Sequence, residues 1–153
     1  MKPITAEWVG KAEGDFATVE REARARKNPN YDGVCFHAQQ CAEKYLKALA
    51  VELDLPFLRT HDLVILLEQL LPVYPLWEVY RGDLAYLSEF AVSFRYPGES
   101  ADRESALDAR WRCRIFRRAA LTALGLPTSA NPNPQSLLAA SRPSSSARPP
   151  LVG

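Results

Sequence analysis

Apolar residues in the first 126 positions recur at intervals of three and four, which is the period of an α-helix. The opening segment is the clearest case, because Trp8, Ala12, Phe16, Val19 and Ala23 form one apolar stripe. No segment alternates convincingly between apolar and polar residues at the period of two that marks a β-strand. The sequence therefore predicts an all-α protein in which helices cover one another's apolar stripes.

Proline, glycine and asparagine clusters divide this pattern into successive helices. We expect helices over about 6–26, 32–53, 61–71, 76–94 and 102–124. Thr5 and Thr60 are suitable N-caps for the first and third of these, which would place His61 in a first helical turn. The short connections predict antiparallel neighbours and an up-down bundle of four to five helices.

The chain has 153 residues, enough for one domain with a hydrophobic core but not for two large ones. Its formal net charge of +1 argues against a globally basic nucleic-acid-binding protein. Composition changes at Pro127, because residues 127–153 hold half of the 12 prolines and no acidic or aromatic residue. We expect a helical domain over 1–126 and a disordered Pro/Ser-rich tail over 127–153. Without the tail's Arg142 and Arg148, the 19 basic residues fall to 17 against 18 acidic ones.

Cysteine and histidine content limits the chemistry. Cys35, Cys41 and Cys113 form no CxxC pair and cannot all be joined in disulfides, which favours a reducing, cytoplasmic compartment. Because His37 and His61 are the only histidines, we expect no metal site and no cofactor. We expect no membrane association either, since no apolar stretch reaches the length of a membrane span.

The second predicted helix carries a polar face opposite its apolar one. His37, Gln40, Lys44 and Lys47 lie on this face and could form a groove that meets a phosphate group. The alternative is an ordinary solvated face with Glu43 and Lys47 paired one turn apart. For His61, the functional interpretation is that it points into the same groove, and the alternative is local capping and packing.

Two further candidates lie later in the chain. Arg95 and Tyr96 precede a Pro-Gly break, where the arginine could bind a phosphate and the tyrosine could stack on a base. The alternative is an arginine that interacts with the last carbonyl groups of its own helix. The arginine run from 110 to 118 could bind RNA, or could be ion-paired with carboxylates of the first helix. Those carboxylates are Glu7, Glu13, Asp15 and Glu20.

Four segments in order resemble the motifs of HEPN domain proteins. They are FHAQQCAEKYLKAL at 36–49, WVGKAEGDF at 8–16, THDL at 60–63 and FRYP at 94–97. The resemblance covers roughly residues 5–124. It implies an all-helical bundle that is usually a homodimer, of a kind found in prokaryotic toxin–antitoxin and defence systems. It also implies a partner, because many members pair with a minimal nucleotidyltransferase.

Many proteins of this family are metal-independent endoribonucleases with an arginine and a histidine separated by four to six intervening residues. The arginine would stabilise charge on the RNA phosphate and the histidine would move a proton. Arg95 matches the arginine, but Ser100, Ala101 and Asp102 stand where the histidine would be. We therefore identify no catalytic residue. The lead interpretation is a nucleotide- or RNA-phosphate-binding partner subunit of a nucleotidyltransferase.

The alternative interpretation is an endoribonuclease with a rearranged site, in which His37 or His61 would act with Arg95. A third possibility is a dimerisation module that binds no ligand.

Overall fold

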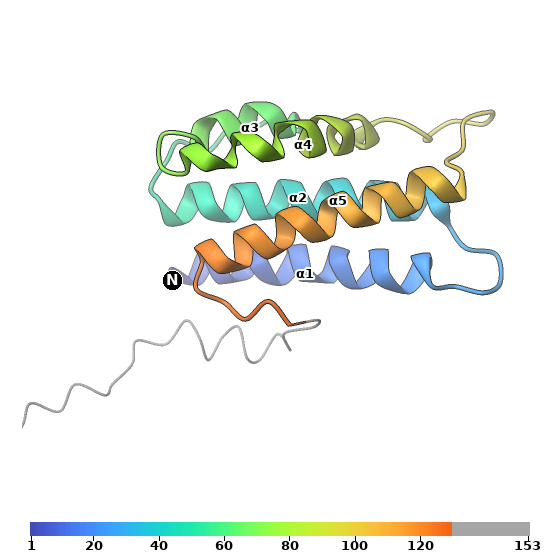
Figure 1. Ribbon diagram of the computed structural model, residues 1–153, viewed down its shortest axis with the longest axis horizontal. Helices are drawn as coiled ribbons and strands as arrows, with labels where there is room; N and C mark the ends of the chain where they lie inside the picture. Colours follow the sequence, from blue (N-terminus) through green and yellow to red (C-terminus); the bar gives the residue numbers. More distant parts are fainter. Residues whose placement is uncertain (130–153) are drawn as a thin grey trace, which may run out of the picture.

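The computed structural model describes residues 1–129, and this part of the chain contains five α-helices and no strand (Figure 1). The helices are α1 (Pro3–Ala23), α2 (Tyr31–Glu52), α3 (Leu63–Leu70), α4 (Arg81–Ser88) and α5 (Arg103–Ala123). Two 3₁₀ helices, η1 (Pro75–Tyr80) and η2 (Glu89–Ala91), flank α4. The predicted all-helical bundle is confirmed. The predicted tail at 127–153 lies outside the described residues, apart from its first three.

Paired side chains show that α1 runs antiparallel to both α2 and α5. Partners follow opposite orders along the helices: Lys2 reaches Asp54 and Asp15 reaches His37, while Glu13 pairs with Arg117 and Glu20 with Arg110. The two helices that pack on α1 therefore run in the same direction as each other, as Figure 1 shows.

Residues 53–62, which we call the crossover segment, connect α2 to α3 by turning back along α2. At its end His61 contacts Glu43, a residue in the middle of α2. As a result α3 runs in the same direction as α2 (Figure 1). Helix α4 then returns antiparallel to α3, with Arg81 at its start bonded to Glu68 of α3 at 2.8 Å.

Helix α2 lies at the centre of the bundle. Between Cys41 and Ala50 every residue except Lys44 is buried, including the charged Glu43 and Lys47. A helix that is buried nearly all round needs neighbours on several sides. Polar residues of α2 can therefore contact α1 on one side and the crossover segment on the other.

The starts of α1 and α3 differ from the sequence prediction. Helix α1 begins at Pro3, so Thr5 lies inside the helix and its hydroxyl donates to Glu52 at 2.6 Å. Proline is favoured at a first helical position because it has no N–H to satisfy there. At α3 the cap is Asp62, whose carboxylate accepts from Val64 and Ile65. Thr60 and His61 therefore precede the helix.

The single helix predicted over 76–94 is interrupted. Regular α-helix covers only Arg81–Ser88, with 3₁₀ turns on either side. Phe94 has a φ angle of 65°, in the left-handed region that a bulky side chain rarely adopts. The helical run ends at Ala91, and Phe94 lies near the start of an exposed loop, residues 92–102, which we call the Arg95 loop (Figure 1).

The inward face of α5 also differs from what its apolar periodicity predicts, which is that Trp111 faces the core together with Leu107, Ile115, Phe116 and Ala119. The Trp111 side chain is 61% exposed. The buried stripe consists mainly of smaller residues: Ala106, Ala109, Cys113, Phe116, Arg117, Ala120 and Leu121. Small side chains allow α5 to pack closely on α2, and larger residues are left on its outer face.

Candidate functional site

The first polar cluster lies between α1 and α2 and is organised by Asp15, a buried carboxylate of α1. Asp15 Oδ1 lies 2.7 Å from His37 Nδ1, and Oδ2 accepts a hydrogen bond from Lys44 Nζ. A carboxylate can only accept, so Nδ1 of His37 carries the hydrogen. The Nε2 atom of the same imidazole, which is an acceptor when the ring is neutral, belongs to a side chain that is one-third exposed.

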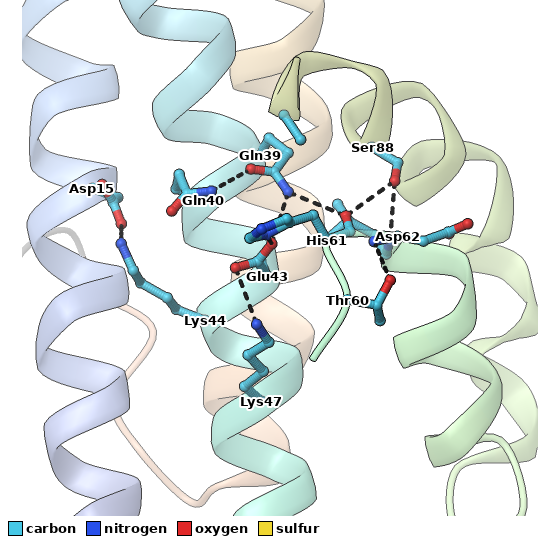
Figure 2. Close-up of polar contacts among 12 residues, drawn as sticks. Asp15, Gln39, Gln40, Glu43, Lys44, Lys47, Thr60, His61, Asp62 and Ser88 are labelled. Carbon is cyan, nitrogen blue, oxygen red and sulfur yellow. Dashed lines mark hydrogen bonds and ion pairs between the residues drawn. The ribbon is translucent and has the colours of Figure 1, made fainter. Parts of the chain in front are cut away.

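The second polar cluster surrounds Glu43 on the opposite side of α2 (Figure 2). Its carboxylate is 2.7 Å from His61 Nδ1, 3.3 Å from Lys47 Nζ and 3.2 Å from Gln39 Nε2. Glu43, Lys47 and Gln39 are buried, whereas the His61 side chain is 72% exposed. The buried members are therefore satisfied internally, and His61 is the member that meets solvent.

Further hydrogen bonds hold the backbone around His61 in place. Its carbonyl oxygen accepts from Gln39 Nε2 at 3.4 Å and from Ser88 Oγ at 3.4 Å. The Ser88 hydroxyl also accepts from the amide of Leu63 at 3.0 Å. The end of the crossover segment is thus fixed between α2 and the C-terminal end of α4 (Figure 2).

The predicted groove is divided between these two clusters. His37 and Lys44 lie with Asp15, while Lys47 and His61 lie with Glu43. Gln40 belongs with the second cluster, because its side-chain amide donates to Gln39 Oε1 at 2.7 Å (Figure 2). The predicted pairing of Glu43 with Lys47 is present, but it is buried and not solvated.

Both imidazoles share one chemical arrangement. In each, a buried carboxylate accepts a hydrogen bond from Nδ1, and no hydrogen bond to Nε2 is present within residues 1–129. When the ring is neutral, Nε2 is an acceptor. Such a ring can accept a hydrogen bond from a hydroxyl or amino group, or take a proton from it. The two lysines cannot offer a free charge as readily, because each is bonded to a carboxylate of its own cluster.

Arg95 and Tyr96 form no hydrogen bond with either cluster within the described residues. Arg95 Nη2 donates to the carbonyl oxygen of Ala91 at 2.6 Å, which is the helix-end contact considered as the alternative above. Within residues 1–129 no hydrogen bond joins this arginine to His37 or His61. Tyr96 is 70% exposed. Both are in reach of solvent on a loop whose start is constrained by Phe94.

The far end of the Arg95 loop is attached to the bundle. The amide of Ala101 donates to Asp32 Oδ1 at 2.6 Å, and Asp102 caps α5 by accepting from Ser105. Gly98, with φ of 91°, allows the chain to turn between these ends. The loop is therefore exposed but held at both ends.

Most of the arginine run is ion-paired. Arg117 is bidentate to Glu13 at 2.5 and 2.7 Å, and Arg110 is bidentate to Glu20 at 2.7 and 2.9 Å. Burial alone would raise the pKa of Glu20, but the hydrogen bond from Arg110 and nearby arginine charges outweigh it and lower that pKa. Asp15, which the prediction grouped with these carboxylates, pairs with α2 instead.

The cysteines do not supply a nucleophile to the site. All three are buried free thiols. Burial, with a smaller effect from Asp32 and Asp102, raises the pKa of Cys35 to about 12. Burial likewise raises the pKa of Cys41 well above its ordinary value. At neutral pH the thiols of Cys35 and Cys41 are protonated, and all three buried cysteines pack as small core residues.

The sequence prediction missed Asp15 and Gln39 as members of the clusters and gave Glu43 only a surface role. Asp15 had no local signal, because its partners lie 22 and 29 positions further along the chain. Gln39 and Glu43 did have a signal in the sequence. They are polar residues one turn apart, and the strongly apolar Leu63–Leu70 segment implies that α3 packs against α2 near them.

These observations define an all-helical bundle whose central helix carries buried carboxylate–imidazole pairs. The family model of the HEPN domain matches residues 5–122, and the chain belongs to this family. No curated protein and no solved structure matches the chain. Membership supports a HEPN-family role related to nucleotides or RNA. Over the described residues, no helix has the length and apolar character needed to cross a membrane.

Proposed function

We propose that this chain is a HEPN subunit that works by binding, not by cleaving RNA. Its ligand is a nucleotide or an RNA phosphate, and its protein partner is a minimal nucleotidyltransferase in a toxin–antitoxin or defence-type module. The observation that carries the proposal is the exposed Arg95–Tyr96 pair on a loop held at both ends, with no histidine after it in the sequence.

The chemistry of this pair suits a nucleotide. A guanidinium group donates several hydrogen bonds in one plane, which matches the oxygens of a phosphate. Arg95 gives one of these donors to Ala91 and keeps others for a ligand. An exposed tyrosine ring next to it offers a face on which a base can stack. Strain at Phe94 is a further sign of a functional loop, since such backbone is retained where a site needs it.

The remaining candidates have supporting roles in this proposal. The free Nε2 atoms of His37 and His61 are hydrogen-bond acceptors for ligand hydroxyl or amino groups. Lys44 and Lys47 are each bonded to the carboxylate of their own cluster, and Gln40, which is bonded to Gln39 and is partly exposed, can contact the ligand as well.

Two measurements test the proposal. The first is titration of a fluorescent ATP analogue into wild type, Arg95→Ala and Lys11→Ala. Loss of a charge-assisted phosphate contact should weaken binding by about tenfold in Arg95→Ala. Lys11 is an exposed cation of α1 outside the site, so its variant should bind as wild type does. Absence of binding, or equal weakening in both variants, would overturn the ligand assignment.

The second measurement is co-expression with a minimal nucleotidyltransferase of the same genome, followed by size-exclusion chromatography. A stable co-eluting complex is the expected result. Separate elution of the two proteins, in the presence and absence of ATP, would overturn the partner assignment without affecting the ligand assignment.

A rearranged endoribonuclease is the second candidate, and one observation favours it. Each imidazole is oriented by a buried carboxylate, as a general base would be. The contacts of Arg95 oppose it, because this arginine bonds to Ala91 and not to either histidine in the described part of the chain. Binding therefore remains the better-supported function.

A further inference from the structure

An open groove with a volume of about 1450 Å³ lies along the outer face of α5, bordered by α1 and by η1. Sites for small molecules usually measure about 300–1,000 Å³, so this groove suits an extended ligand. Neither polar cluster nor the Arg95 loop lines it. It is therefore separate from the site proposed above.

Aromatic side chains line the η1 side of the groove. Tyr74 and Trp77 are stacked with ring centroids 4.4 Å apart and planes 16° from parallel. Trp111 of α5 also lines the groove and is 61% exposed, which is unusual for so large an apolar side chain. An accessible indole beside a stacked pair offers a surface on which a nucleobase can stack.

Arginines without a carboxylate partner follow Trp111 along α5. Arg114 and Arg118 are exposed, and no ion pair involves them within residues 1–129. Spacings of three and four residues put them on one helix face with Trp111, about 4.5 and 6 Å further along the axis in turn. The groove thus places one exposed ring and two available cations in a row.

The charge balance of the groove favours an anion. Five arginines line it, and Glu20 is the only acidic residue among its described lining. That carboxylate is already bonded to Arg110 and to Arg24. The C-terminal segment beyond Ser129 does not complement this charge, because its charged side chains are Arg142 and Arg148.

We propose that this groove is a second binding site, specific for single-stranded nucleic acid. Phosphates contact Arg114 and Arg118, and a base stacks on Trp111. An acidic peptide would satisfy the arginines but would leave the aromatic surface unused. The inference goes beyond the proposed nucleotide site, and it uses different residues.

The proposed nucleic-acid site is tested by measuring, with fluorescence anisotropy, the binding of a labelled 12-nucleotide RNA and of a DNA with the same sequence. The full chain is used in an Arg95→Ala background, so that the first site does not contribute. The double variant Arg114→Gln/Arg118→Gln should bind the oligonucleotide at least about tenfold more weakly. A plot of the logarithm of its association constant against the logarithm of the salt concentration should be less steep by about 1.4. Trp111→Ala should weaken binding by about tenfold, and Trp111→Phe should recover most of the loss.

The matched control is Lys11→Gln/Arg103→Gln, which removes the same charge from exposed positions outside the groove. It should retain most of the affinity. Tighter binding of RNA than of DNA supports the proposal and indicates that the protein contacts the 2′-hydroxyl group. Equal binding of RNA and DNA also supports it, and indicates that the contacts are with phosphates and stacked bases alone. No saturable binding of either oligonucleotide overturns it, as do equal losses in the control and groove variants. Equal binding of a polyglutamate peptide also overturns it.

Discussion

Glu43 and His61, which are 18 positions apart in sequence, are joined by a 2.7 Å hydrogen bond between Oε1 and Nδ1. The carboxylate is buried and the imidazole is largely exposed. This bond attaches the crossover segment to the middle of α2 and determines how α3 enters the bundle. Polar residues of α2 therefore stabilise the fold and also hold a side chain that is exposed at the surface.

Glu43→Gln should destabilise the protein by about 3 kcal/mol, because Lys47 would remain buried as a charge without its carboxylate. Adding Lys47→Met should recover much of the loss by removing that charge. Urea unfolding of wild type, both variants and the exposed control Glu7→Gln measures this. If the double variant is no more stable than Glu43→Gln, the buried charge is not the cause.

Glu20→Gln should change the response to acid. Because the folded-state pKa of Glu20 lies below its ordinary value of 4.5, its ionised form stabilises the fold at neutral pH. That contribution is lost as the pH falls through the lowered pKa. We expect the variant to be about 1 kcal/mol less stable at pH 7, with the difference shrinking as the pH falls below 4.5 and through the lowered pKa. Unfolding curves across this range test it, and a constant difference would contradict the assignment.

Native thiols should resist alkylation. With a pKa of about 12, Cys35 is thiolate in only about one molecule in ten thousand at pH 8. Burial further restricts access to all three cysteines. Iodoacetamide treatment followed by mass spectrometry should show little labelling of the folded protein and three labels after denaturation. Rapid labelling of any native cysteine would contradict the burial described here.

The fold was largely predictable because its information is local. Apolar periodicity and helix breakers place the ends of α2 and α5 within one residue of their observed positions. The prediction was wrong where contacts between helices determine the role of a residue or the face that it occupies. Thr5 gives its hydroxyl to Glu52 of another helix, and Trp111 is exposed because smaller residues of α5 face α2.

The site was less predictable for the same reason. The type and spacing of His37 and Lys44 placed them together on one helix face, as observed. Their shared partner, Asp15, belongs to another helix and looks in sequence like an ordinary surface carboxylate. Only the packing of α1 on α2 buries it. The separation of His61 from this cluster likewise depends on the path of the crossover segment.

A metal-free RNA cleavage assay distinguishes a HEPN subunit that only binds its ligand from one that cleaves RNA. End-labelled RNA is incubated in EDTA with wild type or with Arg95→Ala and followed by gel electrophoresis. The RNA should stay intact with both proteins, because no histidine follows Arg95 and neither imidazole bonds to it in the described chain. Fragments produced by wild type and absent with Arg95→Ala would contradict the proposed binding role and identify the protein as a nuclease.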